Sequence, residues 1–387
     1  MSAKRLLTPL TTQLLPQLRA PIVCGPMANA SGGALTGAVC AGGGLGFIGA
    51  GYYTASQLKE ELEHVYKALG GRPERGRARL EAGIGFLAWR LTAMNDNQPP
   101  PSLGSSDLDA SSQALALIDE ALRAKPRAVW MSFGEREELV GWCRVVRERE
   151  AALNGGGKAK WGTELKLFVG VGTRDEARCA VEEAGADVVV VTGVEAGGHG
   201  LGASPPLASF LPLVRAQLPS WQTSNPAGSQ PLLLAAGGLH SGQSLAACLA
   251  QGADGAVFGT RFLMTPEAAY TPEQKQILTD ADESRTKRTM AFDEARGTMG
   301  WPKGVDGRGV VNETVHDYER GLGNPESRRE RYGEAVKEKD TKRIVTWAGT
   351  GVGNVSKIMP AAEVVQEIEK EAIDAVERLG AMVGTKE

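Results

Sequence analysis

The chain has 387 residues, of which 42% are hydrophobic and 5% aromatic, and it contains 50 glycines. This length exceeds a usual single domain of roughly 100 to 200 residues but fits one α/β barrel of about 250 residues with an insertion. The net charge of −3 excludes an extended basic surface, and no apolar run reaches the roughly 18 residues of a membrane span. We therefore expect a protein that acts on a small molecule, with no nucleic-acid and no membrane partner.

The cysteines and the N-terminus both bear on the cellular compartment. The five cysteines form no C-x-x-C pair and lie mostly in apolar segments, which favours reduced, buried thiols over a disulfide framework. Lys4 and Arg5 precede leucines that are interrupted by Thr, Pro and Gln, so no signal-peptide core forms. We expect a cytoplasmic protein, with a mitochondrial location as the alternative.

Short apolar runs recur along the first 260 residues and predict eight strands. They cover residues 21–25, 44–49, 82–87, 128–132, 166–171, 187–192, 232–236 and 255–259. Helical patterns lie between them, among others at 55–68, 112–124, 135–150, 174–184 and 242–251. Strand–helix alternation implies parallel pairing with right-handed crossovers. The predicted fold class is therefore α/β, a (β/α)8 TIM barrel, in preference to a Rossmann sheet.

The strand pattern stops at about Met264, and charged, helical sequence continues to Asn354. Glycines and a proline near residue 300 indicate a loop that covers a pocket. After this segment, apolar residues between 364 and 376 have the spacing of one amphipathic helix that returns to close the barrel. We predict a barrel formed by residues 1–263 and 355–387, with a mostly helical inserted domain at 264–354 covering the active site.

The segment 44–49 matches G-x-G-x-x-G, the pattern of a dinucleotide site. That pattern should follow a strand and open a helix, whereas these glycines overlap the second predicted strand itself. We attribute them to close packing in the barrel.

Two glycine turns near the end of the barrel indicate a phosphate site. Gly237 and Gly238 end the strand at 232–236, and a helix starts near Ser241, whereas Gly259 and Thr260 end the next strand. Barrels commonly hold phosphate in the loops after strands 7 and 8, and exposed amides at such turns favour an anion. The alternative is that these glycines only make tight turns.

The most informative histidine is His199, which follows the sixth predicted strand within the segment 193–200. An imidazole titrates near about 6.5, so it can accept a proton or, once charged, hold an anion. The alternative is a structural histidine in the core. We expect Glu195 to accept backbone hydrogen bonds, His240 to support phosphate or cap the next helix, and His64 and His316 to lie at the surface. The sequence lacks H-E-x-x-H and spaced Cys and His ligands, so we expect no metal site.

Five segments together resemble the nitronate monooxygenase family, formerly called 2-nitropropane dioxygenases, whose members are FMN-dependent TIM-barrel enzymes. They are residues 21–28 (PIVCGPMA), 42–51 (GGGLGFIGAG), 195–199 (EAGGH), 235–238 (AAGG) and 259–260 (GT). Segments 85–87 and 130–134 resemble the fungal branch of the family. The resemblance implies a bound FMN and a catalytic role for His199.

The resemblance also implies which residues hold the cofactor. Pro26, Met27 and Ala28 would line the isoalloxazine, Gly197 and Gly238 would approach the flavin, and Val257, Phe258, Gly259 and Thr260 would help to hold its phosphate. Gly237 joins this set as part of the glycine turn that indicates a phosphate site. The sequence departs from the bacterial pattern at two flavin-contacting positions. Thr192 stands where those relatives have glutamine, and Gly85 stands where they often have asparagine.

The expected activity is the oxidation of alkyl nitronates by O2 to carbonyl compounds and nitrite, without NAD(P)H, by a monomer or a homodimer. One alternative is an FMN-dependent NAD(P)H:quinone or enoyl-thioester reductase on the same barrel, and another is a flavin- or phosphate-binding barrel without turnover. Inosine monophosphate dehydrogenase chemistry is disfavoured, because the segment 193–204 lacks the cysteine nucleophile that it requires.

Overall fold

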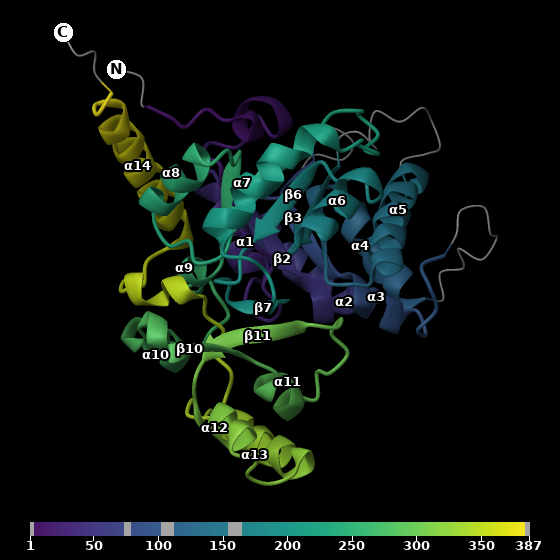
Figure 1. Ribbon diagram of the computed structural model, residues 1–387. Coiled ribbons are helices and arrows are strands. Elements are labelled where there is room, and N and C mark those ends of the chain that lie inside the picture. The colour runs from purple at the N-terminus through teal and green to yellow at the C-terminus, as the bar shows by residue number, and fades with distance from the viewer. Residues whose placement is uncertain (1–3, 73–78, 102–111, 154–164, 384–387) are drawn as a thin grey trace.

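The computed structural model describes residues 4–72, 79–101, 112–153 and 165–383. Its centre is a closed barrel of parallel strands in chain order, with the last strand pairing with the first (Figure 1). The strands are β1 (Ile22–Cys24), β2 (Leu45–Gly49), β3 (Leu80–Leu87), β4 (Pro126–Ser132), β5 (Lys166–Val171), β6 (Val188–Thr192), β8 (Leu232–Ala236) and β9 (Gly255–Phe258). Each predicted strand is present, and the predicted TIM barrel is confirmed.

Helices surround the barrel. They are α1 (Gly33–Ala41), α2 (Ala55–Ala68), α3 (Ala88–Met94), α4 (Gln113–Arg123), α5 (Arg136–Leu153), α6 (Arg174–Glu182), α7 (Leu207–Gln217), α8 (Gly242–Ala250), α9 (Thr260–Leu263) and α14 (Ala361–Gly380). Thr54, Thr173 and Ser241 cap α2, α6 and α8 through capping boxes, which is why these helices begin where the sequence predicts. Within the described ranges, no helix combines the length and the apolar character needed to cross a bilayer.

The barrel interior is filled at its amino-terminal end. Phe47 contacts Trp130 and Phe168, with ring centroids 5.3 Å and 5.1 Å apart. The N-terminal residues Leu10 and Leu15 belong to the same buried cluster. The ligand space of this barrel therefore lies at the other end, where the strands finish.

We expect Phe47→Ala to lower the free energy of unfolding by about 3–5 kcal/mol, because Phe47 is fully buried and its loss leaves a cavity among rings. The shift in the urea unfolding midpoint measures this. Leu322→Ala is the control, since Leu322 is 48% exposed and its loss should change the free energy by about 0.5 kcal/mol at most. Equal effects of the two changes would contradict the packing argument.

The G-x-G-x-x-G segment contains all of β2 and does not open a helix. A Cβ atom on Gly46 would lie 2.4 Å from the carbonyl oxygen of Thr36 in α1. The glycine thus allows α1 to pack against the strand, and the prediction of close packing is confirmed. The apolar pattern does not predict α1 itself, because two glycines lower its helix propensity and packing against α2 and β2 compensates for them.

The cysteines are all free thiols; Cys40 is half-buried and the other four are buried. Burial raises the pKa of Cys40 and of Cys143 to about 12, so both remain protonated at neutral pH. These are the surroundings of structural thiols, as expected from the sequence.

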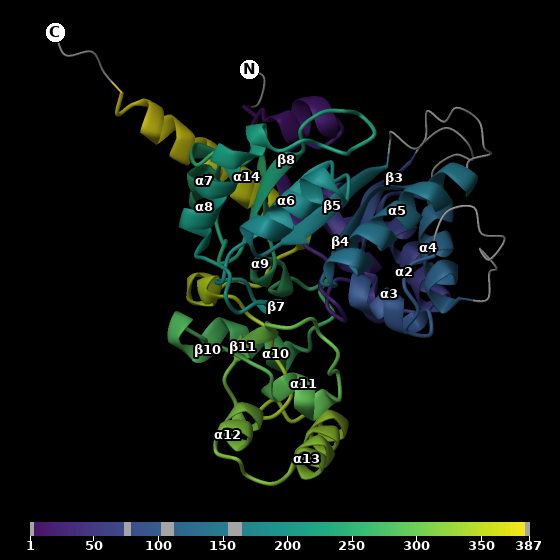
Figure 2. The ribbon, with the colours of Figure 1, turned by 45° about the vertical axis from the view of Figure 1, so that its right-hand side comes forward.

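Residues 264–354 leave the barrel after α9 and extend beyond its carboxyl end (Figure 2). They contain α10 (Pro272–Asp280), β10 (Thr286–Thr289), α11 (Ala291–Arg296), β11 (Val305–Val310), α12 (Glu313–Glu319) and α13 (Pro325–Glu338). Beside the predicted helices, the two strands form an antiparallel sheet in the order β10-β11-β7, where β7 is Gly198–Leu201. We did not predict these three strands. The pairing of β11 with β7 joins segments about a hundred residues apart, and β10 and β11 are short strands that carry charged residues.

Candidate active site

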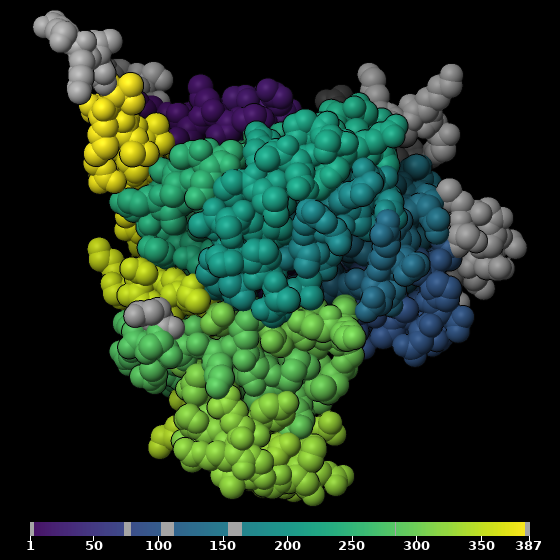
Figure 3. Space-filling view, viewed as in Figure 1, coloured from purple at the N-terminus to yellow at the C-terminus, as the bar shows by residue number. Residues whose placement is uncertain are grey.

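A cavity of about 370 Å³ opens among the loops at the carboxyl ends of the strands. In the space-filling view the segment 264–354 packs against this end of the barrel (Figure 3). The cavity brings together every candidate residue from the sequence: Pro26, Met27, Ala28, Gly85, Thr192, Gly197, His199, Gly237, Gly238, Val257, Phe258, Gly259 and Thr260. Segments that lie far apart along the chain thus meet at one site.

One wall of the cavity is the turn after β1. Gly85 in β3 faces this turn, and a Cβ atom at Gly85 would lie 2.3 Å from the Cβ atom of Pro26. A side chain such as asparagine at this position would displace Pro26. On the other side of the cavity, Thr192 ends β6, and its hydroxyl donates to the carbonyl of Val190 at 3.4 Å. Glycine at position 85 is therefore needed for Pro26 to lie where it does. At this position the cavity is lined by backbone and not by an amide side chain.

The glycine turns after β8 and β9 form the far end of the cavity. Gly237 and Gly238 have φ values of +113° and +70°, which side-chain-bearing residues rarely adopt. A Cβ atom at Gly259 would meet only the sulfur of Met27, at 3.7 Å. This end is open and lined by backbone, as a phosphate site requires. His240 lies beside it with Nδ1 3.2 Å from the carbonyl oxygen of Gly238, whereas Ser241, and not His240, caps α8.

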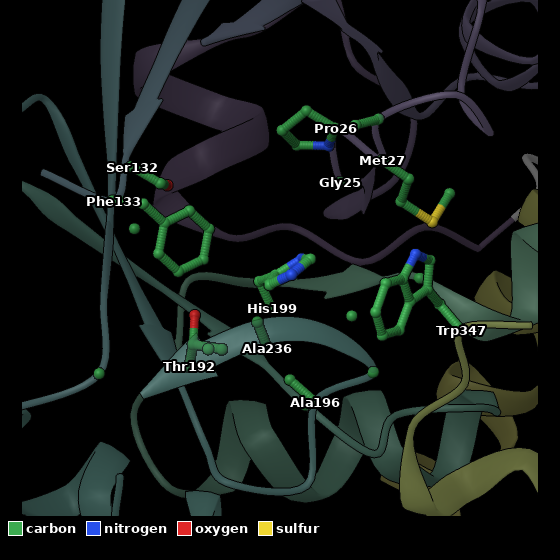
Figure 4. Close-up of a pocket in the computed structure, with 18 of the residues that line it drawn as sticks. Gly25, Pro26, Met27, Ser132, Phe133, Thr192, Ala196, His199, Ala236 and Trp347 are labelled. Atoms are coloured by element: carbon green, nitrogen blue, oxygen red, sulfur yellow. The ribbon is translucent and has the colours of Figure 1, made fainter. Parts of the chain in front are cut away.

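His199 lies on β7, opposite Gly307 of β11, rather than in an irregular loop. Figure 4 shows its ring near the middle of the cavity, with Pro26 and Met27 on one side and Thr192 on the other. The ring stacks on Trp301, with centroids 3.6 Å apart and planes at 11°, and Trp347 lies 4.9 Å away. The barrel and the inserted segment therefore both surround this histidine.

Asp293 in α11 is the partner of His199. Both carboxylate oxygens of Asp293 lie 2.9 Å from Nε2 of the imidazole. The carboxylate is fully buried, and its Oδ1 also accepts from the hydroxyl of Thr298 at 2.8 Å and from the indole N–H of Trp301 at 3.1 Å. We did not predict Asp293, because it lies 94 positions from His199 in a short charged helix; its only local signal is the apolar neighbour Phe292.

The pKa of His199 lies below its ordinary value of about 6.5. Burial is the main cause, since it disfavours the charged ring, and Arg296 and Arg288 act in the same direction. Asp293 opposes them through its hydrogen bond and its charge. At neutral pH the imidazole is consequently uncharged and available to accept a proton.

The aromatic side of the cavity contains further residues that sequence reasoning missed. Trp301 contacts Phe133, with ring centroids 5.4 Å apart, and Arg296 lies over the ring of Trp347 at 5.9 Å. The buried hydroxyl of Tyr52, which also lines the cavity, has no hydrogen-bond partner among the described residues. Trp301, Pro302 and Lys303 of the segment near residue 300 line the cavity.

Glu195 holds the segment before His199 in place. Its carboxylate accepts from the backbone N–H of Leu207 at 3.0 Å, as expected of a structural carboxylate. Arg288 and Arg308 donate to the carbonyls of Gly200 and Val194 from the inserted segment. His64 lies at the surface, 3.5 Å from Glu61, and His316 is half-buried in α12, so neither reaches the cavity.

Residues 158–371 match the family model for nitronate monooxygenase. The chain belongs to the nitronate monooxygenase family. Two fungal relatives are similar over almost the whole chain. The nitronate monooxygenase of Neurospora crassa is 28% identical over 98% of this chain and 96% of its own. The nitronate monooxygenase npaC of Metarhizium robertsii is 29% identical over 92% of each chain. The family expected from the sequence is confirmed. As a member of the nitronate monooxygenase family, the protein is an oxidoreductase.

Two solved structures are similar to this chain over almost its whole length. Nitroalkane oxidase from Streptomyces ansochromogenes is 28% identical, with a TM-score of 0.68 over 96% of this chain and 99% of its own. FabK from Thermotoga maritima has a TM-score of 0.70 over 98% of this chain and 100% of its own. Its identity is 22%, so FabK supports the fold alone.

Proposed function

We propose that this protein binds FMN in the cavity and oxidises alkyl nitronates with O2 to carbonyl compounds and nitrite. The observation that carries the proposal is that His199 and the glycine turns after β8 and β9 line one cavity. The site also belongs to a chain similar to proteins named nitronate monooxygenases. We further propose that the enzyme acts as a monomer or a homodimer in the cytoplasm.

The residues present fit FMN. A volume of about 370 Å³ falls within the usual range of about 300–1,000 Å³ for ligand pockets. Pro26, Met27 and Thr192 would hold the ring system, and the open turn at Gly259 would take the phosphate. When bound, FMN supplies an acceptor for the electrons of the substrate. In our proposal the barrel is formed by residues 1–263 and 355–387, and the domain at 264–354 covers the cofactor.

His199 has two roles in this proposal. As a neutral imidazole it takes a proton from the carbon next to the nitro group of a nitroalkane, which produces the nitronate. The imidazolium that results is a cation beside the nitronate and holds it in the cavity. Stacking on Trp301 and the hydrogen bond to Asp293 keep the ring in one orientation during both steps.

The deciding experiment is a visible spectrum of the purified protein, recorded before and after anaerobic addition of propyl-2-nitronate. We expect an FMN spectrum that loses its oxidised bands with the nitronate and recovers them in air, with release of acetone and nitrite. NADH should leave the bands unchanged. Fast bleaching by NADH alone would favour the reductase alternative, and a bound flavin inert to all of these compounds would favour a barrel without turnover.

The lowered pKa of His199 predicts the pH dependence with a neutral nitroalkane. Neutral imidazole is the active form, and its fraction falls only as the pH drops through the lowered pKa. We therefore expect kcat/KM to stay level through neutral pH and to fall only below pH 6.5. A pH series at low nitroethane concentration measures the acid limb. A limb centred above the ordinary histidine value would contradict the assignment of His199 as the base.

A further inference from the structure

We propose that Asp293 is a positioning residue that fixes the tautomer of His199, so that Nε2 carries the proton and Nδ1 is the basic atom facing the substrate. This assigns a task at the reaction centre to the inserted segment 264–354, which supplies Asp293 from α11. The part that concerns reactivity rests on the function proposed above. The part that concerns the tautomer does not.

The hydrogen bonds decide which nitrogen bears the proton. Nε2 of His199 faces both oxygens of Asp293 at 2.9 Å, and a carboxylate only accepts. Nε2 must then be the donor, and in a neutral imidazole the other nitrogen is a bare acceptor. No hydrogen-bond partner of Nδ1 occurs among the described residues, and His199 lines the cavity. Nδ1 is consequently the nitrogen left for the substrate.

The surroundings of Asp293 keep its carboxylate in one orientation. The hydroxyl of Thr298 and the indole N–H of Trp301 both donate to Oδ1. Trp301 cannot reverse this bond, because an indole nitrogen is a donor only. The same Trp301 stacks on the imidazole, so one side chain holds both members of the pair.

This arrangement predicts a specific fault in Asp293→Asn. The amide oxygen of the asparagine would stay at the Oδ1 position, where Thr298 and Trp301 supply donors. The amide NH₂ would then face Nε2 of His199 and donate to it. That bond requires Nε2 to be bare, which moves the imidazole proton to Nδ1 and removes the basic atom from the cavity. The substitution changes a proton position while it keeps size and shape.

The test combines nitrogen-15 NMR of the imidazoles with steady-state kinetics, both on the full-length protein reconstituted with FMN. Nitrogen-15 shifts distinguish a proton-bearing imidazole nitrogen from a bare one, and His199→Asn identifies the His199 signals among the four histidines. Asp317→Asn is the matched control. Asp317 is also a buried carboxylate of the inserted segment, but it pairs with Arg331 and Arg343 and does not line the cavity.

We expect the wild type to show a proton on Nε2 and Asp293→Asn to show it on Nδ1. The same variant should lose roughly 10²- to 10⁴-fold in kcat/KM for nitroethane, and Asp317→Asn should keep the wild-type tautomer and most of the activity. A wild type with its proton on Nδ1, or an Asp293→Asn protein that keeps it on Nε2, overturns the proposal. An equal loss of activity in Asp317→Asn overturns it too.

The two proposals fail in different ways. If nitronates are not oxidised but the wild type carries its proton on Nε2, the proposed function falls and the tautomer assignment stands. If nitronates are oxidised but the proton sits on Nδ1, the positioning role of Asp293 falls alone. The wild-type spectrum decides the tautomer even if Asp293→Asn does not fold.

Discussion

Replacing His199 by asparagine should lower kcat/KM for nitroethane by roughly 10²- to 10⁴-fold, the usual contribution of a general base. The asparagine amide offers no nitrogen that accepts a proton at neutral pH. FMN should remain bound, because the substitution leaves Pro26, which we propose lies against the flavin ring, and the turn at Gly259 unchanged. Oxygen consumption and the visible spectrum of the same sample measure turnover and cofactor content together.

The pre-formed nitronate separates the base from other roles of His199. Ethyl nitronate arrives without the proton that His199 removes, so the loss with this substrate should be clearly smaller than with nitroethane. His64→Asn is the control, since His64 is at the surface and its replacement should leave both substrates unaffected. Full nitroethane turnover by His199→Asn with FMN bound would falsify the assignment.

Gly259→Asp should abolish most FMN binding while the protein stays folded. Gly259 has a negative φ of −110°, and a Cβ atom at this position would meet only the sulfur of Met27, at 3.7 Å. The new carboxylate would therefore stand in the open turn, beside the cofactor phosphate. Two like charges about 4 Å apart at an effective dielectric constant of about 20 cost on the order of 4 kcal/mol, which corresponds to a rise in Kd of roughly 10³-fold.

Gly259→Asn separates charge from size in this experiment. Asparagine has nearly the shape of aspartate without its charge, so this variant should bind FMN much better than Gly259→Asp. Fluorescence titration of the apoproteins with FMN measures both constants, and circular dichroism checks the fold. Equal losses in the two variants would mean that the size of the new side chain, and not its charge, weakens FMN binding. Unchanged binding in both variants would show that the phosphate does not lie at this turn.

The sequence by itself determined the barrel and most of its cavity. Strands that are buried on both faces, such as β6 with four consecutive valines, read as continuous apolar runs whatever their partners are. Capping residues such as Ser241 act within four positions of the chain, so helix starts are also visible locally. Because strand ends in a parallel barrel all meet at one edge, glycine turns at 237–238 and 259–260 could be assigned to one site without coordinates.

Only the tertiary structure decided how His199 is held. Its partner Asp293 lies in a helix of six residues whose sequence resembles that of a charged surface helix. Asp293 is buried only because α11 packs against Trp347 and β11. The strand that carries His199 contains two glycines and shows no alternation, since its pairing with β11 comes from backbone hydrogen bonds. Local patterns record the burial of a segment, whereas a contact between segments 94 positions apart exists only once the chain has folded.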